Sequence, residues 1–264
     1  MNYPARIIKK GETDAAIVKA IKQKLNSALG IKNNTDERLN PDNPNFGERM
    51  FRLVKLFQAR NVDGSGTPLK QDGEIGSLTW EALFGELSVV RTNRTGDGFF
   101  DEVLRIAALQ EQNKVREKPK NSNKGPEVNE YLRRAGVWPG LAWCAAFVYW
   151  CCDEAAINLA RGNPVVRTAG CLDHWRKAPA AGATRIQRLA AKQNPSLVKP
   201  GMIFIQDHGQ GLGHTGLIES VSGGLITTIE GNTDASKTRE GGGVYRLTRK
   251  IVDINTGFIS YHGL

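Results

Sequence analysis

LAWCAAFVYWCC, residues 141–152, is the least polar stretch of this chain and carries three of its four cysteines. The pair Pro139-Gly140 breaks the chain just before it, so a helix is predicted to begin near Leu141 or Ala142. Such an apolar helix belongs in a core, and its surroundings indicate which kind of core.

Segments with apolar residues at helical spacing precede this stretch, and short segments rich in β-forming residues follow it. FFDEVLRIAALQEQ predicts a helix, and Pro126 suits the first turn of the next one. Beyond residue 200 the predicted strands are GMIFIQ, HTGLIESV, LITTIE, GVYRLTRKI and FISYH. Helices followed by an antiparallel sheet define an α+β domain, which we predict over residues 97–264.

A smaller helical domain is predicted over residues 10–85, with a linker at 86–96. Apolar residues at helical spacing indicate one helix from Asp14 to Leu29, and a short repeat predicts two more. In the repeat, Phe46-Gly47 is followed by Phe51 and Val54, and Ile75-Gly76 is followed at the same offsets by Trp80 and Leu83. Each glycine permits a tight turn, and Ser77 is the expected N-cap of the third helix.

The formal net charge of +9 predicts a surface that attracts polyanions, whether nucleic acid, acidic lipid or an anionic cell-wall polymer. We expect no nucleic-acid partner, because the chain has no basic stripe with interleaved aromatic residues. The first residues lack the continuous apolar core of a signal peptide, and residues 137–152 are too short for a membrane helix. We therefore expect synthesis in the cytoplasm without a signal peptide, and no stable membrane insertion.

Among the cysteines, Cys144 is the candidate nucleophile. Only the thiolate is nucleophilic, and Cys144 falls in the first helical turn, where free N–H groups and the helix dipole favour an anion. Cys151 and Cys152 lie about two turns further along, where we expect small buried hydrophobic residues. The four cysteines have no paired short spacings, so neither a disulfide framework nor a zinc motif is predicted.

Cys144 needs a base, and His214 is the best placed of the four histidines. It opens HTGLIESV directly after the glycine-rich GQGLG, and a three-residue loop at 221–223 would place it opposite Glu230. A two-residue loop would move Glu230 to the other face of the sheet. His214 would take the thiol proton, with Glu230 or Asn232 holding its other ring nitrogen and backbone N–H groups at the helix start stabilising the oxyanion. The remaining histidines, which lack such a pattern, are expected to be structural: His174, His208 and His262.

NKGPEVNEYLRRAG, WCAAFVYWC, GHTGLIESV and TIEGNT together resemble the cysteine- and histidine-dependent amidohydrolase/peptidase (CHAP) family, which has a papain-like fold. The resemblance implies Cys144 as nucleophile, His214 as base, Glu230 as its orienting carboxylate and Asn232 as a further polar partner. We expect no cofactor, because the chain lacks a compact Asp-rich loop of the kind that would indicate the calcium some relatives use. VWPGLAW lacks the glutamine that often precedes the cysteine in papain-like enzymes, so a second oxyanion donor is not assigned.

LVKLFQARNVD, followed by LKQDGEIGSLTWEALFG, resembles the helical peptidoglycan-binding domain family, whose repeat has an FQ pair and a DG-x-Φ-G-x-x-T segment. The proline-rich insert at 40–45 departs from the usual compact first turn. We assign no individual wall-binding residues, because apolar residues at helical spacing such as Phe57, Trp80 and Leu83 are expected in the core.

The two resemblances together imply a peptidoglycan hydrolase that cleaves an amide in the peptide part of the bacterial wall, either as an amidase or as an endopeptidase. The alternative is a non-catalytic or transferase-type peptidoglycan-binding protein. Without a signal peptide, the enzyme would reach the wall or periplasm as a phage lysis enzyme or a secreted antibacterial effector. An immunity protein or a component of a secretion apparatus would then be a further partner.

Overall fold

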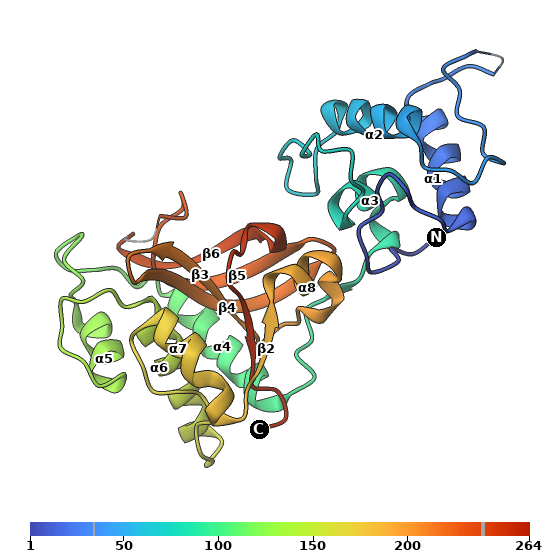
Figure 1. Cartoon of the computed structure of the whole chain (residues 1–264). Helices are drawn as coiled ribbons and strands as arrows, with labels where there is room; N and C mark the ends of the chain where they lie inside the picture. Colours follow the sequence, from blue (N-terminus) through green and yellow to red (C-terminus); the bar gives the residue numbers. More distant parts are fainter. Residues whose placement is uncertain (34, 239–240) are drawn as a thin grey trace. The chain divides into compact units, whose positions relative to one another are not determined.

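The computed structural model describes residues 1–264 except 34 and 239–240, and the chain divides into two compact units (Figure 1). The first comprises residues 1–90 with the short segments 192–196 and 222–225. The second comprises residues 91–191, 197–221 and 226–264.

The first unit contains three α-helices among its described residues: α1 (Ala15–Ala28), α2 (Glu48–Arg60) and α3 (Ser77–Phe84). A 3-10 helix, Glu86–Ser88, follows them. Asp14 caps α1, because its side chain accepts hydrogen bonds from the backbone N–H groups of Ala16 and Ile17. The apolar faces of the three helices share one core, which includes Ile21, Met50, Val54, Phe57, Trp80 and Leu83.

The two copies of the predicted repeat begin in the same way. Gly47 precedes α2 and Gly76 precedes α3, each in an extended conformation and without a side-chain cap. The expectation that Ser77 caps α3 is therefore wrong, because Ser77 is already the first helical residue. The buried amide of Gln58 holds the turn between them, accepting from the N–H of Gly73 at 2.9 Å and donating to the carbonyl of Glu74 at 2.8 Å.

The second unit joins helices to a sheet. Its α-helices are α4 (Gly98–Gln112), α5 (Pro126–Arg134), α6 (Cys144–Asn158), α7 (Cys171–Lys177) and α8 (Arg188–Gln193). Its 3-10 helices are Ala178–Ala181 and Ile251–Asp253, and a further one, Pro195–Leu197, begins in the segment 192–196 of the first unit. Its strands are β1 (Arg91–Thr92), β2 (Thr184–Gln187), β3 (Ile203–Gly209), β4 (Leu212–Ser222), β5 (Leu225–Thr233), β6 (Gly243–Lys250) and β7 (Gly257–Ser260).

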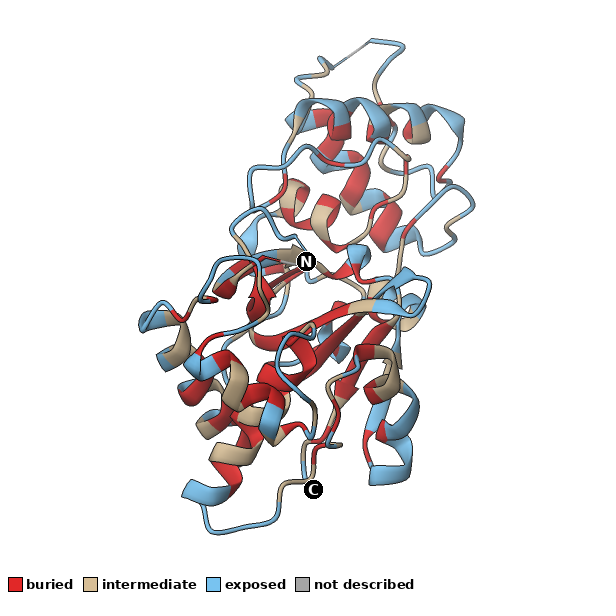
Figure 2. Ribbon diagram, turned by 90° about the vertical axis from the view of Figure 1, so that its left-hand side faces the viewer, coloured by how far each residue is buried: buried red, intermediate tan, exposed pale blue. Residues whose placement is uncertain are grey.

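The seven strands found among the described residues form one sheet, ordered β2-β7-β3-β4-β5-β6, with β1 paired to β4. The pairs β2–β7, β3–β7 and β3–β4 are antiparallel. Helices α4 and α6 pack on one face, where Phe147 and Cys151 share a core with Ile205 and Leu217. The opposite face carries a smaller core around Phe204, Ile218 and Phe258. Figure 2 shows that much of the sheet is buried.

The predicted α+β class is confirmed, with helices on a sheet that is antiparallel at every pair named above. The predicted strands beyond residue 200 correspond to β3 through β7. Sequence patterns did not indicate α7, β2 or α8, which are at most seven residues long and too short for a periodicity to be recognised.

Candidate active site

Cys144 is the first residue of α6, which begins two or three residues later than expected. Trp143, fully buried, precedes it and donates from Nε1 to Oε1 of Glu117 at 2.9 Å. On β5, Gly231 lets the helix approach closely, since a Cβ atom there would lie 2.7 Å from both Trp143 and Phe147. The start of α6 is therefore fixed against the sheet, with the Cys144 thiol in the first turn.

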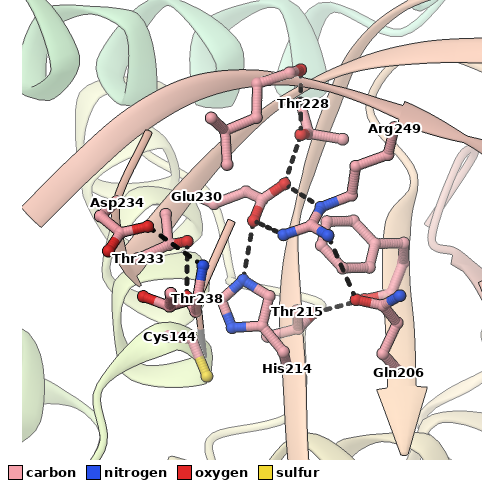
Figure 3. A network of polar contacts seen from close by, with 12 residues as sticks. Cys144, Gln206, His214, Thr215, Thr228, Glu230, Thr233, Asp234, Thr238 and Arg249 are labelled. Atoms are coloured by element: carbon pink, nitrogen blue, oxygen red, sulfur yellow. Dashed lines mark hydrogen bonds and ion pairs between the residues drawn. The ribbon is translucent and has the colours of Figure 1, made fainter. Parts of the chain in front are cut away.

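His214 and Glu230 form a buried pair beside Cys144. Nε2 of His214 lies 2.7 Å from Oε2 of Glu230, and their side chains are 1% and 0% exposed. The other ring nitrogen, Nδ1, has no hydrogen-bond partner among the described residues. It points to the side on which the Cys144 sulfur lies (Figure 3). The ring is thus held at one nitrogen by a carboxylate and presents the other to a thiol.

The hairpin that carries this pair differs from the predicted one. Strand β4 ends at Ser222 and β5 begins at Leu225, so the loop has two residues where we expected three. The contact between His214 and Glu230 is kept because β4 is irregular. Ile218 and Val221 lie in the same core. In a regular strand, side chains three residues apart point to opposite faces. Gly216 now lies against Glu230, whose Cγ would be 2.6 Å from a Cβ at that position.

Arg249 on β6 is a member of the site that sequence reasoning missed. Its Nε donates to Oε1 of Glu230 at 2.5 Å and its terminal nitrogen to Oε2 at 2.6 Å, a two-pronged ion pair (Figure 3). Thr228 adds a hydrogen bond to Oε1 at 2.5 Å. Burial alone would raise the pKa of Glu230, but Arg249 and His214 outweigh it and lower the pKa to about 2. Glu230 is therefore a carboxylate at any physiological pH.

Arg249 is itself held in place. Its guanidinium lies 5.3 Å from the centre of the Phe204 ring, and the side chain is 9% exposed. An ion pair between two strands produces no pattern in the spacing of residues along the sequence. The signal available in the sequence was the buried Glu230, a charge that requires a partner.

Cys171 is the second residue of the site that we did not predict. It begins α7, and its Sγ lies 3.3 Å from Sγ of Cys144. The pKa of Cys144 lies well below its usual value, chiefly through the hydrogen bond with Cys171, against the opposing effect of burial, and then through His214 and the backbone N–H of Ala145. The nucleophile candidate is thus set up as a thiolate.

His214 complements that thiolate. Burial by itself would lower its pKa, but its interactions with Cys144 and Glu230 outweigh that penalty and raise the pKa to about 9. Between the two titrations Cys144 is negative and His214 positive. The arrangement is a thiolate–imidazolium pair, in which the sulfur attacks and the ring supplies a proton.

This pair predicts a bell-shaped dependence of kcat/KM on pH, with an acid limb well below the ordinary thiol pKa of 9.0 and an alkaline limb near 9. Below the acid limb the sulfur is protonated, and above the alkaline limb His214 has lost the proton it must give to the leaving group. Both limits belong to the coupled pair. The check is the rate of iodoacetamide alkylation of Cys144 against pH, beside initial hydrolysis rates. Alkylation that begins only near pH 9 in the wild type would contradict the pairing.

Asn232 lies two residues beyond Glu230 and has no hydrogen bond to His214. Its side chain is buried, its backbone φ is +57°, and neither amide atom has a partner among the described residues. Of the two alternatives for orienting His214, the geometry therefore favours Glu230, which occupies Nε2. The role of Asn232 as a further polar partner stays a prediction.

Two of the other histidines have structural partners. His174 is buried, with Nε2 2.9 Å from the Tyr261 hydroxyl, and burial lowers its pKa to about 4. His262 uses both nitrogens, with Nδ1 2.9 Å from Oγ of Ser260 and Nε2 3.0 Å from the carbonyl oxygen of Pro200. His208 lies exposed near the end of β3.

Cys151 and Cys152 lie in the main core between α6 and the sheet, as expected. Both are fully buried, and burial raises the pKa of each thiol. They therefore stay protonated and unreactive, in contrast to Cys144.

Comparison with known families agrees with this geometry. Residues 136–232 match the CHAP domain family. The match includes Cys144, His214, Glu230 and Asn232, and it ends before Arg249. A CHAP domain has a papain-like fold and implies a hydrolase of the peptidoglycan amidase and peptidase kind. No curated protein and no solved structure matches the chain.

Among the described residues, no helix has the length and apolar character needed to span a membrane.

Proposed function

We propose that this protein is a peptidoglycan hydrolase that uses Cys144 to cleave an amide bond in the peptide part of the bacterial wall. The observation that supports it is the buried series Cys144, His214 and Glu230, lying within the segment that matches the CHAP family. A thiolate, a base and an orienting carboxylate are the parts that acyl transfer through a thioester requires.

The reaction begins when Sγ of Cys144 attacks the substrate carbonyl. The negative charge that forms on the carbonyl oxygen is stabilised by backbone N–H groups at the start of α6, that of Cys144 among them. His214 passes its Nδ1 proton to the leaving amine, and a thioester on Cys144 remains. Water then attacks the thioester, with His214 taking its proton, and the free thiolate is restored.

Glu230 orients His214 throughout this cycle. Its hydrogen bond to Nε2 fixes the ring orientation and leaves Nδ1 to exchange the proton with sulfur and leaving group. Its negative charge also stabilises the imidazolium form, so the proton is available when the amine departs.

For the first unit we propose a wall-binding role, with a helical peptidoglycan-binding domain over residues 10–85. Tethering binding to cleavage would raise the local concentration of substrate at the catalytic unit. The protein would act at the bacterial wall or in the periplasm, as a phage lysis enzyme or as a secreted effector. In the second case an immunity protein or a component of a secretion apparatus would be a further partner.

Digestion of purified peptidoglycan tests the proposed reaction. We expect soluble fragments whose masses identify the bond: an intact stem peptide freed from muramic acid for an amidase, or a cut stem or cross-bridge for an endopeptidase. Fragments rejoined to an added amine would instead indicate a transferase. A protein that binds sacculi and releases nothing would contradict the proposed hydrolysis.

A further inference from the structure

Two thiols meet at the candidate active site. Sγ of Cys144 and Sγ of Cys171 are 3.3 Å apart, although the residues are 27 positions apart in the chain. They are 2% and 6% exposed and, with Ala145, form a small cluster separate from the core that holds the other two cysteines. The contact with Cys171 lowers the pKa of Cys144, but no step of the proposed hydrolysis makes or breaks a bond at the second sulfur.

The position of Cys171 is fixed by its surroundings. A Cβ atom at Gly213, the residue before His214, would lie 3.2 Å from Cβ of Cys171, so Cys171 packs against the strand that carries the base. The turn before α7 is tied down by Thr168, whose hydroxyl accepts from the N–H of Gly170 at 3.1 Å and donates to Asp173 at 2.8 Å. The second thiol is therefore held beside the first.

We propose that Cys144 and Cys171 form a reversible disulfide that switches the hydrolase off under oxidising conditions. The proposal rests on the proposed function in taking Cys144 as the nucleophile. Oxidation needs no large rearrangement, because the sulfurs must close from 3.3 Å to a bond length of about 2.05 Å. Both cysteines begin a helix, where rotation about the side-chain bonds can supply that movement.

The oxidant we name is hydrogen peroxide. The Cys144 thiolate attacks one peroxide oxygen, so that an S–O bond forms, the O–O bond breaks and hydroxide leaves, giving a sulfenic acid. The sulfur of Cys171 then attacks that of Cys144, so that an S–S bond forms, the S–O bond breaks and the oxygen leaves as water with the Cys171 proton. The two thiols lose two electrons and peroxide gains them. A dithiol reductant reverses the change by thiol–disulfide exchange.

The lowered pKa of Cys144 makes it the cysteine that peroxide oxidises first, because thiolates react with peroxide and thiols do not. The raised pKa values of Cys151 and Cys152 keep those residues out of the reaction. Cys171 also protects the nucleophile, because a sulfenic acid captured as a disulfide does not proceed to sulfinic acid, which dithiols cannot reduce.

The test treats the full chain with limiting hydrogen peroxide, then with dithiothreitol, and follows thiol content, peptide masses and peptidoglycan release. We expect the denatured wild type to fall from four free thiols to two, with Cys144 and Cys171 recovered in one disulfide-linked peptide pair. Dithiothreitol should restore activity. In a second arm with excess peroxide, the Cys144 sulfenic acid of Cys171→Ser has no neighbouring thiol to capture it and should proceed to sulfinic acid. The fraction of its own reduced activity that dithiothreitol recovers should then fall on the order of tenfold or more below that of the equally treated wild type.

Cys152→Ala is the matched control, since it removes a core thiol and should still lose two thiols on oxidation. Cys171→Ala is the second variant if serine disturbs folding, which circular dichroism would show. Four thiols remaining in the peroxide-treated wild type, or equal recovery with and without Cys171, would overturn the proposal. A reduced protein that releases no peptidoglycan fragments would contradict the proposed function. The disulfide would still be tested, because the thiol count and the peptide masses are measured without substrate.

Discussion

Cys144→Ala should abolish the release of peptidoglycan fragments, with a loss of turnover on the order of 10⁴-fold or more. Alanine keeps the start of α6 and its backbone N–H groups but removes the sulfur that attacks the carbonyl. No other described thiol is placed to replace it: Cys151 and Cys152 lie in the core, and Cys171 begins α7, whereas the proposed oxyanion-stabilising N–H groups are at the start of α6. The measurement is fragment release from purified sacculi, quantified by mass.

Two controls accompany this variant. Cys152→Ala changes a buried thiol two turns along the same helix and should retain hydrolysis, because it lies outside the site. Binding of Cys144→Ala to insoluble peptidoglycan should equal that of the wild type, since the proposed wall-binding unit is unchanged. Fragment release that persists without the sulfur would show that another group performs the chemistry.

The place of Cys144 could be predicted because it depends on local rules. A Pro-Gly break followed by an apolar run indicates a helix start, and the residue in its first turn follows from the count. The α+β class depends on equally local patterns, helical spacing before β-rich runs. Such features are set by neighbours in the chain, which the sequence displays directly.

We predicted the pairing of His214 with Glu230, but from a hairpin geometry that the structure does not have. We predicted a three-residue loop, and the structure has a two-residue loop combined with an irregular β4. Each change alone would move Glu230 to the other face, and the two together cancel. A strand irregularity depends on packing against the two cores, so no residue pattern in β4 revealed it.

Arg249 and Cys171 could not be found from spacing at all. Each enters the site from an element distant in sequence, β6 in one case and α7 in the other. What the sequence did contain was a requirement: a buried carboxylate beside a histidine needs a cation or several donors. Arg249 meets that requirement, which makes it the next residue to test.

Arg249→Met should destabilise the second unit by about 3–5 kcal/mol, because it leaves the buried charge of Glu230 without its strongest partner. Methionine retains much of the side-chain length and the contact with Phe204 while removing both hydrogen bonds to the carboxylate. Chemical denaturation of wild type and variant at neutral pH measures the difference in free energy of unfolding.

The pH dependence of that difference identifies its cause. In the wild type the pKa of Glu230 falls from an ordinary 4.5 to about 2, so the ionised group contributes stability that is complete above pH 4.5 and lost as pH falls through about 2. Without Arg249 the folded-state pKa rises, so the stabilisation is lost at a higher pH. The variant should therefore unfold in acid well before the wild type.

Arg249 also acts on catalysis through Glu230 and His214. At the alkaline limb Glu230 is ionised with or without Arg249, so removing the positive charge of Arg249 leaves the carboxylate to stabilise the imidazolium alone, and the alkaline limb near pH 9 should move to higher pH. Arg249→Lys keeps the charge but not the two-pronged geometry and should recover part of this shift. Arg105→Met, which breaks an exposed pair with Glu102, is the matched control and should change neither limb. A pH profile in Arg249→Met that falls in height and keeps both limits would show that Arg249 supports the fold without positioning the base.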